Sequence, residues 1–197
     1  MSDVKSFADF LRRIRAGDAD AAALLVRRYE PVIRCEARLH MTDPRLARLF
    51  DSMDICQSVL ASFFVRAAAG QFDLNQPKDL IRLLVRMAHN KVASQARRQH
   101  ARAADRERAD VSDLAQVGAV EPTPSRLAAS RDLLTEVQRR LTAEERQIAD
   151  LRGEGRAWPA VAAALGGTPE ARRKQLTRAL DRVAQELGID EDSDATS

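Results

Sequence analysis

An apolar repeat of helical period runs along both ends of this chain and is missing from its middle, and this pattern constrains the fold most. Apolar residues recur three or four positions apart over residues 7–102 and again over residues 129–187, as the buried stripe of an amphipathic helix requires. Between residues 103 and 126 the repeat fades, and Gly118, Pro122 and Pro124 appear, which is typical of a linker. The sequence therefore predicts a first domain over residues 1–105, a flexible linker over 106–128, a second domain over 129–188 and an acidic disordered tail over 189–197.

The composition favours an all-α fold with two small helical domains. Ala, Leu and Arg dominate the 197 residues, and runs of β-branched residues are scarce, which suits helices better than strands. No apolar run reaches the roughly 18 residues that a membrane span needs, and no secretory segment opens the chain. We therefore expect a cytoplasmic protein without a membrane partner.

Helical segments of the first domain follow from the apolar repeat and from the residues that break it. Helices are expected over residues 7–14, from about Asp20, from residue 51 or 52 to Gly70, and from about Lys78 to about residue 102. The second of them is expected to turn Leu24, Leu25, Val32 and Ile33 to the core, and Pro31 implies a kink in it or a junction between two helices. Cys35 and Cys56 are expected to be small buried helix residues in a reducing cytosol.

The second domain contains a helix-turn-helix pattern. Thr142 and Glu145 form a T-x-x-E capping box that starts one helix. A short helix over residues 159–165, a turn at Gly166-Gly167 and a last helix capped by Thr168 follow it, as in helix-turn-helix motifs. The first turns of the last helix suit a major groove; its candidate DNA contacts are Arg172, Arg173, Lys174, Gln175 and Arg178. The alternative is a solvated basic face on an ordinary helical hairpin.

A second basic surface lies on the helix that ends near residue 102. Its candidate contacts are Arg86, Asn90, Lys91, Gln95, Arg97 and Arg98. Such a face can follow phosphates and hydrogen-bond to bases. Taken alone, the segment reads more readily as a solvated charged face.

Three segments, in this order, resemble the extracytoplasmic-function (ECF) group of RNA polymerase sigma factors. They are residues 51–60 (DSMDICQSVL), residues 83–91 (LLVRMAHNK) followed by Arg97 and Arg98, and residues 141–146 (LTAEER) with the helix-turn-helix that follows. The resemblance covers roughly residues 9–187 and implies that the first domain is sigma region 2 and the second is sigma region 4.

The resemblance also implies partners and roles. Core RNA polymerase would be bound by Asp51, Asp54 and Gln57. The downstream (−10) promoter element would be recognised and opened by the basic helix together with Asp73 and Asn75 in the preceding loop, and the upstream (−35) element by the last helix. An anti-sigma factor is a further expected partner, whereas a catalytic residue, a cofactor and a metal are not expected.

Two other classes of protein are compatible with parts of the sequence. A stand-alone helix-turn-helix regulator would dimerise on a palindromic site, but no heptad seam for a dimer is evident. An enzyme is disfavoured because His40, His89 and His100 are scattered and no phosphate loop or metal-ligand spacing occurs. A sigma-like protein that binds DNA without polymerase is a third reading.

Overall fold

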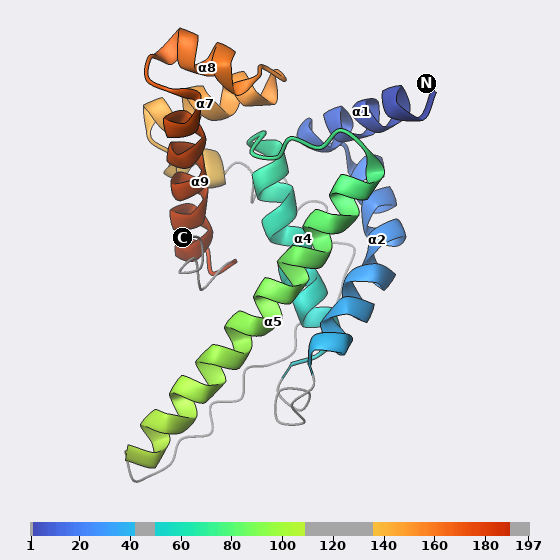
Figure 1. Ribbon diagram of the computed structural model, residues 1–197, viewed down its shortest axis with the longest axis vertical. Coiled ribbons are helices and arrows are strands. Elements are labelled where there is room, and N and C mark those ends of the chain that lie inside the picture. Colours follow the sequence, from blue (N-terminus) through green and yellow to red (C-terminus); the bar gives the residue numbers. More distant parts are fainter. Residues whose placement is uncertain (1, 42–49, 109–135, 190–197) are drawn as a thin grey trace.

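The computed structural model describes residues 2–41, 50–108 and 136–189, and the regular elements in them are helices, which confirms the predicted all-α fold (Figure 1). The helices are α1 (Ser2–Arg15), α2 (Ala19–His40), α4 (Ser52–Ala68), α5 (Pro77–Arg108), α7 (Ala143–Gly153), α8 (Trp158–Leu165) and α9 (Pro169–Glu186). We call α1, α2, α4 and α5 the N-terminal bundle, and α7, α8 and α9 the C-terminal bundle. In the described ranges, no helix combines the length and the apolar character needed to cross a membrane.

Helix α2 shows how a four-residue repeat positions the core of the N-terminal bundle. The side chain of Asp18 caps the helix by accepting a hydrogen bond from the backbone N–H of Ala21 at 3.0 Å. The buried positions of α2 then recur every four residues: Ala21, Leu25, Tyr29, Ile33 and Ala37. They belong to the same core cluster as Phe63 of α4 and Leu84 of α5, which are fully buried.

Three predictions about this bundle are wrong in part. Helix α2 continues through Pro31, so it is one helix and not a junction of two. Leu24 and Val32 are 44% and 37% exposed, because each precedes a residue of the buried stripe and therefore points about 100° away from it. Cys35 is exposed and only Cys56 is buried.

The ends of α4 and α5 differ little from the expected ones. Helix α4 begins at Ser52 as predicted. Helix α5 begins at Pro77 and reaches Arg108, so residues 106–108 of the predicted linker are helical. The remainder of the linker and residues 190–197 of the predicted tail lie outside the described residues.

The C-terminal bundle is a helix-turn-helix built on α7. The predicted capping box is present, because the N–H of Thr142 donates to Oε2 of Glu145 at 2.8 Å and the N–H of Glu145 donates to Oγ1 of Thr142 at 3.3 Å. Helix α8 ends at Leu165 and is followed by Gly166, whose φ of 78° favours glycine. Thr168 caps α9 by accepting a 3.1 Å hydrogen bond from the N–H of Ala171. The centre of this bundle is fully buried and apolar: Ile148, Val161, Leu176, Leu180 and Val183.

The two bundles share apolar packing at α4. Val65 and Ala69, near the C-terminal end of α4, cluster with the core of the C-terminal bundle. Helices α4 and α9 lie side by side (Figure 1). Helix α4 therefore contributes to both cores. The two apolar repeats in the sequence predicted two separate domains and gave no sign of this shared packing.

Candidate nucleic-acid and polymerase interfaces

The N-terminal turns of α9 hold the side chains predicted to contact the −35 element. Arg173, Lys174 and Arg178 are exposed, whereas Arg172 and Gln175 are half-buried. The start of a helix also carries a partial positive charge that favours phosphate. The five candidates therefore divide into three exposed cations and two half-buried residues, Arg172 and Gln175.

The guanidinium of Arg172 is hydrogen-bonded on every side within the C-terminal bundle. Its Nε and Nη2 donate to the carbonyl oxygens of Gly166 and Leu165 at 2.8 and 2.5 Å. Its Nη1 donates to Oε1 of Glu144 at 2.5 Å and to Oε1 of Gln175 at 2.7 Å. These bonds connect the start of α9 to the end of α8 and to α7. In this arrangement Arg172 braces the turn, and its DNA contact stays a prediction.

Glu144 is a residue of this site that the sequence did not single out. Its Oε2 accepts a hydrogen bond of 3.0 Å from Nε2 of Gln175. The hydrogen bond from Arg172, and then that from Gln175, lowers the pKa of Glu144 below its usual 4.5, so the group is charged at neutral pH. Glu144 fixes the amide of Gln175 from a helix distant in sequence, which is why local spacing gave no sign of it.

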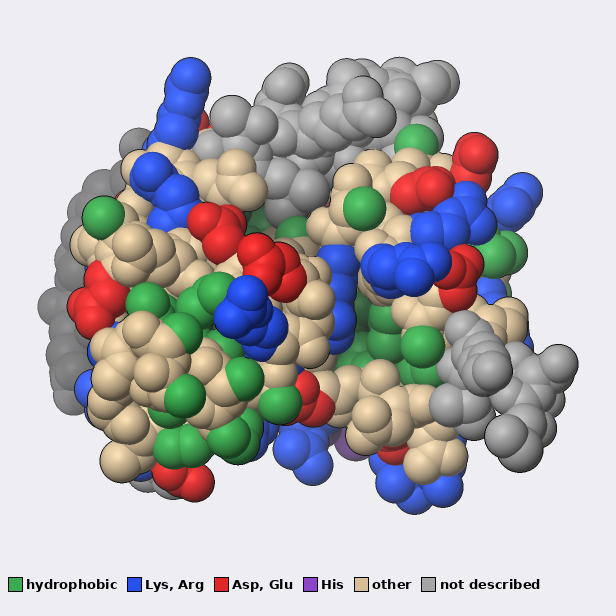
Figure 2. All heavy atoms as spheres, turned by 90° about the horizontal axis from the view of Figure 1, so that it is seen from above, with side chains coloured by type: hydrophobic (Ala, Val, Ile, Leu, Met, Phe, Trp, Pro, Cys, Tyr) green, Lys and Arg blue, Asp and Glu red, His purple; other side chains and the backbone are tan. Residues whose placement is uncertain are grey.

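Helix α8 does not share the basic character of α9. Its sequence holds no charged residue, and Pro159 and Ala160 are exposed on it. Figure 2, seen from above, shows a group of apolar and uncharged side chains on the half that holds the C-terminal bundle, and charged side chains on both halves. Helix α8 therefore fits the supporting helix of the motif, with α9 as the recognition helix.

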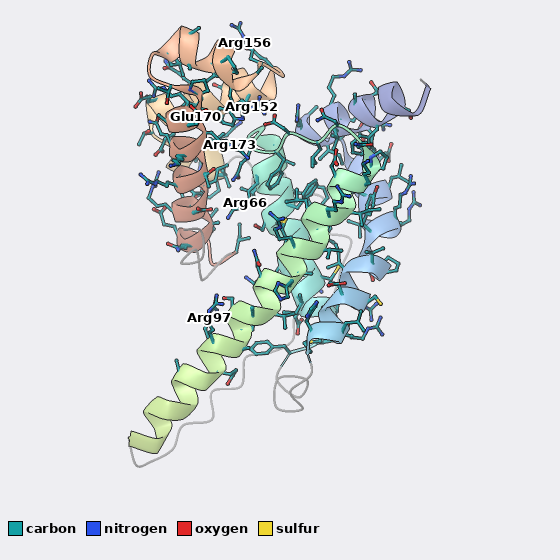
Figure 3. The ribbon with its side chains drawn as sticks, in the orientation of Figure 1. Arg66, Arg97, Arg152, Arg156, Glu170 and Arg173 are labelled. Atoms are coloured by element: carbon teal, nitrogen blue, oxygen red, sulfur yellow. The ribbon has the colours of Figure 1, made fainter. Side chains whose placement is uncertain are left out.

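The candidate residues of α5 divide between two sides of the helix. Arg86, Asn90 and Arg97 are exposed, and their spacing places them on one stripe. Lys91, Gln95 and Arg98 are half-buried and lie about a third of a turn away from that stripe. The last turns of α5 project beyond the bundle, and Arg97 points away from α2 and α4 (Figures 1 and 3).

The end of the C-terminal bundle lies against α4 and α5. The backbone carbonyl of Ile189 accepts hydrogen bonds from Nζ of Lys91 at 3.0 Å and from Oγ of Ser58 at 3.2 Å. Lys91 is a predicted DNA contact, and Ser58 lies in the segment predicted to bind polymerase. The C-terminal bundle therefore contacts both predicted surfaces of the N-terminal bundle.

The loop between α4 and α5 places its two predicted DNA contacts differently. Asn75 is exposed, and its backbone N–H donates to Oδ2 of Asp79 at 3.3 Å. The carboxylate of Asp73 accepts hydrogen bonds from Nη2 of Arg152 at 2.5 Å and from Nε1 of Trp158 at 3.2 Å. The side chain of Asn75 therefore faces solvent, whereas that of Asp73 is 53% exposed and is also hydrogen-bonded to the C-terminal bundle.

The start of α4 carries the residues predicted to bind polymerase. Asp51 and Asp54 are exposed and Gln57 is half-buried. Asp54 also stabilises the helix start, because its Oδ2 accepts a 3.2 Å hydrogen bond from the N–H of Asp51. The inward side of the helix is buried at Ile55, Val59 and Phe63.

Metal ligation has no support in the part of the chain that the structure describes. No group of three or more His, Cys, Asp or Glu there lies close enough to hold a metal ion. The rings of His40 and His89 meet edge to face with their centroids 4.6 Å apart, and His40 Nε2 lies 2.8 Å from the carboxylate of Glu36. The contact between the two rings packs α2 against α5.

Exposed basic side chains on helices of both bundles, within the described residues, are compatible with a DNA-binding protein of transcription. A sequence model described as "ECF sigma factor" matches residues 4–188, a range that takes in both bundles and the segment between them. The chain therefore belongs to the ECF sigma factor family, whose members act in transcription initiation and are not a class of enzyme. The resemblance predicted from three segments is thus confirmed. A search of curated proteins and a search of solved structures found no match.

Proposed function

We propose that this chain binds core RNA polymerase and directs it to promoters of a particular sequence. In this proposal residues 1–105 form sigma region 2 and residues 129–188 form sigma region 4. The observation that carries it is the presence of exposed basic side chains on two helices, α5 and α9, of different bundles. Two separate surfaces suit a protein that contacts two promoter elements at once.

Helix α9 would contact the −35 element in its major groove. Arg173, Lys174 and Arg178 would reach phosphates or guanine edges, and Gln175 would pair with adenine. Arg172 would act through Gln175 and the turn, because its donors are used within the bundle. Removing an exposed cation should therefore weaken binding without loosening the motif.

Helix α5 and the loop before it would bind the −10 element as it opens. A sigma factor needs no catalytic group for this step, since holding one strand single lowers the cost of unpairing. Arg86, Asn90 and Arg97 would follow the strand, with Asp73 and Asn75 as polar contacts to an extruded base. Lys91, Gln95 and Arg98 would complete the surface from the second side of α5.

The start of α4 would bind the polymerase. Asp51, Asp54 and Gln57 offer a polar, acidic surface next to the buried side of the helix. An anti-sigma factor that covered this surface would keep the protein inactive. Family membership and the exposure of Asp51 and Asp54 support these proposals.

Run-off transcription with purified core polymerase and a promoter library tests the proposal. The full chain should yield transcripts from a subset of templates that core polymerase alone does not use. Lys174→Ala should reduce the yield, whereas Arg27→Ala, which removes an equal charge from the exposed side of α2, should not. A chain that neither associates with core polymerase nor starts RNA synthesis would refute the proposal, and dimeric binding to a palindrome without polymerase would indicate a stand-alone regulator.

A further inference from the structure

The side-chain amide of Gln175 on α9 has a partner at each of its two ends. Its Oε1 accepts a hydrogen bond of 2.7 Å from Nη1 of Arg172, and its Nε2 donates a hydrogen bond of 3.0 Å to Oε2 of Glu144. A guanidinium can only donate hydrogen bonds and an ionised carboxylate can only accept them. These partners therefore hold the amide in one orientation, with its nitrogen toward Glu144.

The partners of Gln175 are themselves fixed to the rest of the C-terminal bundle. Nη1 of Arg172 also donates to Oε1 of Glu144 at 2.5 Å, which closes a hydrogen-bonded cycle of three side chains. Arg172 is 13% exposed in its side chain, and its Nε and Nη2 donate to the carbonyls of Gly166 and Leu165. A reversed amide at position 175 would set N–H groups against the guanidinium and an oxygen against the carboxylate. It would therefore lose both of its bonds.

The hydrogen-bonding groups that the cycle leaves on Gln175 match one base better than another. A glutamine amide has two N–H donors, and its oxygen can accept two hydrogen bonds. The cycle uses one donor and one acceptor position, so one of each remains. In the major groove adenine offers the acceptor N7 and a donor on N6, whereas guanine offers the two acceptors N7 and O6. The remaining groups of Gln175 therefore fit adenine at both positions and guanine at only one.

We propose that Glu144 determines the base that Gln175 reads, because it occupies the second N–H group that guanine would need. The inference rests on the proposed function of α9 as the helix that reads the −35 element. Without Glu144 the amide could donate one N–H to N7 and the other to O6, so guanine would become as good a partner as adenine. Glu144 is thus a positioning residue, which acts through Gln175 and makes no contact with the base.

Run-off transcription by the full chain with core polymerase, on templates randomised across the −35 element, tests the inference. Sequencing of the transcribed templates gives the yield for each base at each position. The parent chain should favour adenine over guanine about tenfold at one position, the discrimination expected of a bidentate pair. Gln175→Ala should make all four bases equal there, which identifies the position. Glu144→Ala should instead bring guanine to about the level of adenine, with both above cytosine and thymine.

Two control variants separate the choice of base from charge and from stability. Asp150→Ala removes an equal charge from an exposed site of α7 and should leave the ratio of adenine to guanine unchanged. Val183→Ala opens a cavity in the fully buried core of the C-terminal bundle. It should lower the yield from every template and leave that ratio unchanged. If the ratio fell in Val183→Ala as far as in Glu144→Ala, loosening of the bundle would explain the effect and the inference would be wrong.

The remaining outcomes distinguish this inference from the proposed function. The role of Glu144 is excluded if Glu144→Ala keeps the parent ratio at the position that Gln175→Ala identifies. It is also excluded if the parent chain favours guanine there, or if no position responds to Gln175→Ala. In each of these cases the transcripts themselves uphold the proposed function. A parent chain that yields no transcript from any template contradicts the proposed function, and the inference falls with it.

Discussion

Helices α5 and α9 both present basic side chains, but they hold them in different ways. Helix α5 projects from its bundle with Arg86, Asn90 and Arg97 on an exposed stripe. Helix α9 has Arg172 tied to the end of α8 and to α7 through its guanidinium. Substituting a residue of the exposed stripe should therefore affect DNA binding alone, whereas substituting a side chain that is hydrogen-bonded within its bundle should affect both binding and folding. The comparison therefore separates residues proposed to touch DNA from residues proposed to position them.

The largest expected effect is that of Arg172→Ala. It removes hydrogen bonds to Gly166, Leu165, Glu144 and Gln175 and should lower the free energy of unfolding of the C-terminal bundle by about 2 kcal/mol. Arg97→Ala on the exposed stripe of α5 should change stability by no more than about 0.5 kcal/mol. Urea denaturation of both variants measures the difference.

The conservative variant Arg172→Lys sharpens this result. Lysine keeps the charge but not the planar fork that reaches several acceptors at once, so most of the stability loss should remain. If Arg172→Lys unfolded like the parent chain, charge alone would explain the contact. Equal losses in Arg172→Ala and Arg97→Ala would remove the distinction between the two helices.

The next effect in size concerns Asn75 in the loop before α5. Because its side chain faces solvent, Asn75→Ala should not disturb the bundles, yet it should reduce open-complex formation about tenfold, the effect of one lost hydrogen bond of about 1.4 kcal/mol. Permanganate footprinting of the opened promoter measures it, with Gln76→Ala as the neighbouring control. A double change of Asp73→Ala with Asn75→Ala that left open complexes untouched would remove the loop from the site.

Local features of this fold were predictable from the sequence, and contacts between distant segments were not. The capping box at Thr142 and the helix start after Thr168 follow from rules that act within a few residues. The bracing of Arg172 by Glu144 and the burial of Arg152 against Asp73 depend on how helices meet, which periodicity does not specify. Even within α2, period alone could not choose between adjacent apolar residues such as Leu24 and Leu25.

A smaller effect should appear in the salt dependence of DNA binding. Lys174→Ala removes an exposed cation from α9 and should reduce the slope of log affinity against log salt by about 0.9, the value for duplex DNA. Arg97→Ala should reduce the slope by about 0.7 if α5 binds a single strand. Titration of duplex and single-stranded probes with both variants checks the assignment. A change of slope that did not depend on the form of the probe would contradict the separation of the two surfaces.

The smallest effect expected is the acid sensitivity of the braced helix. Hydrogen bonds from Arg172 and Gln175 lower the pKa of Glu144 below 4.5, so its contribution to stability is complete above that value and is lost as pH falls through the lowered pKa. The pKa of Asp18 in the N-terminal bundle is lowered to about 2 by the hydrogen bond from Arg13. The contribution of Asp18 to stability should therefore be lost as pH falls from about 4 to about 2. Both carboxyl groups are solvent-accessible, so added salt should weaken both effects. Thermal unfolding from pH 6 to pH 3 should therefore show a shallower loss of stability in Glu144→Gln than in the parent chain, and an unchanged pH profile would mean that Glu144 does not brace α9.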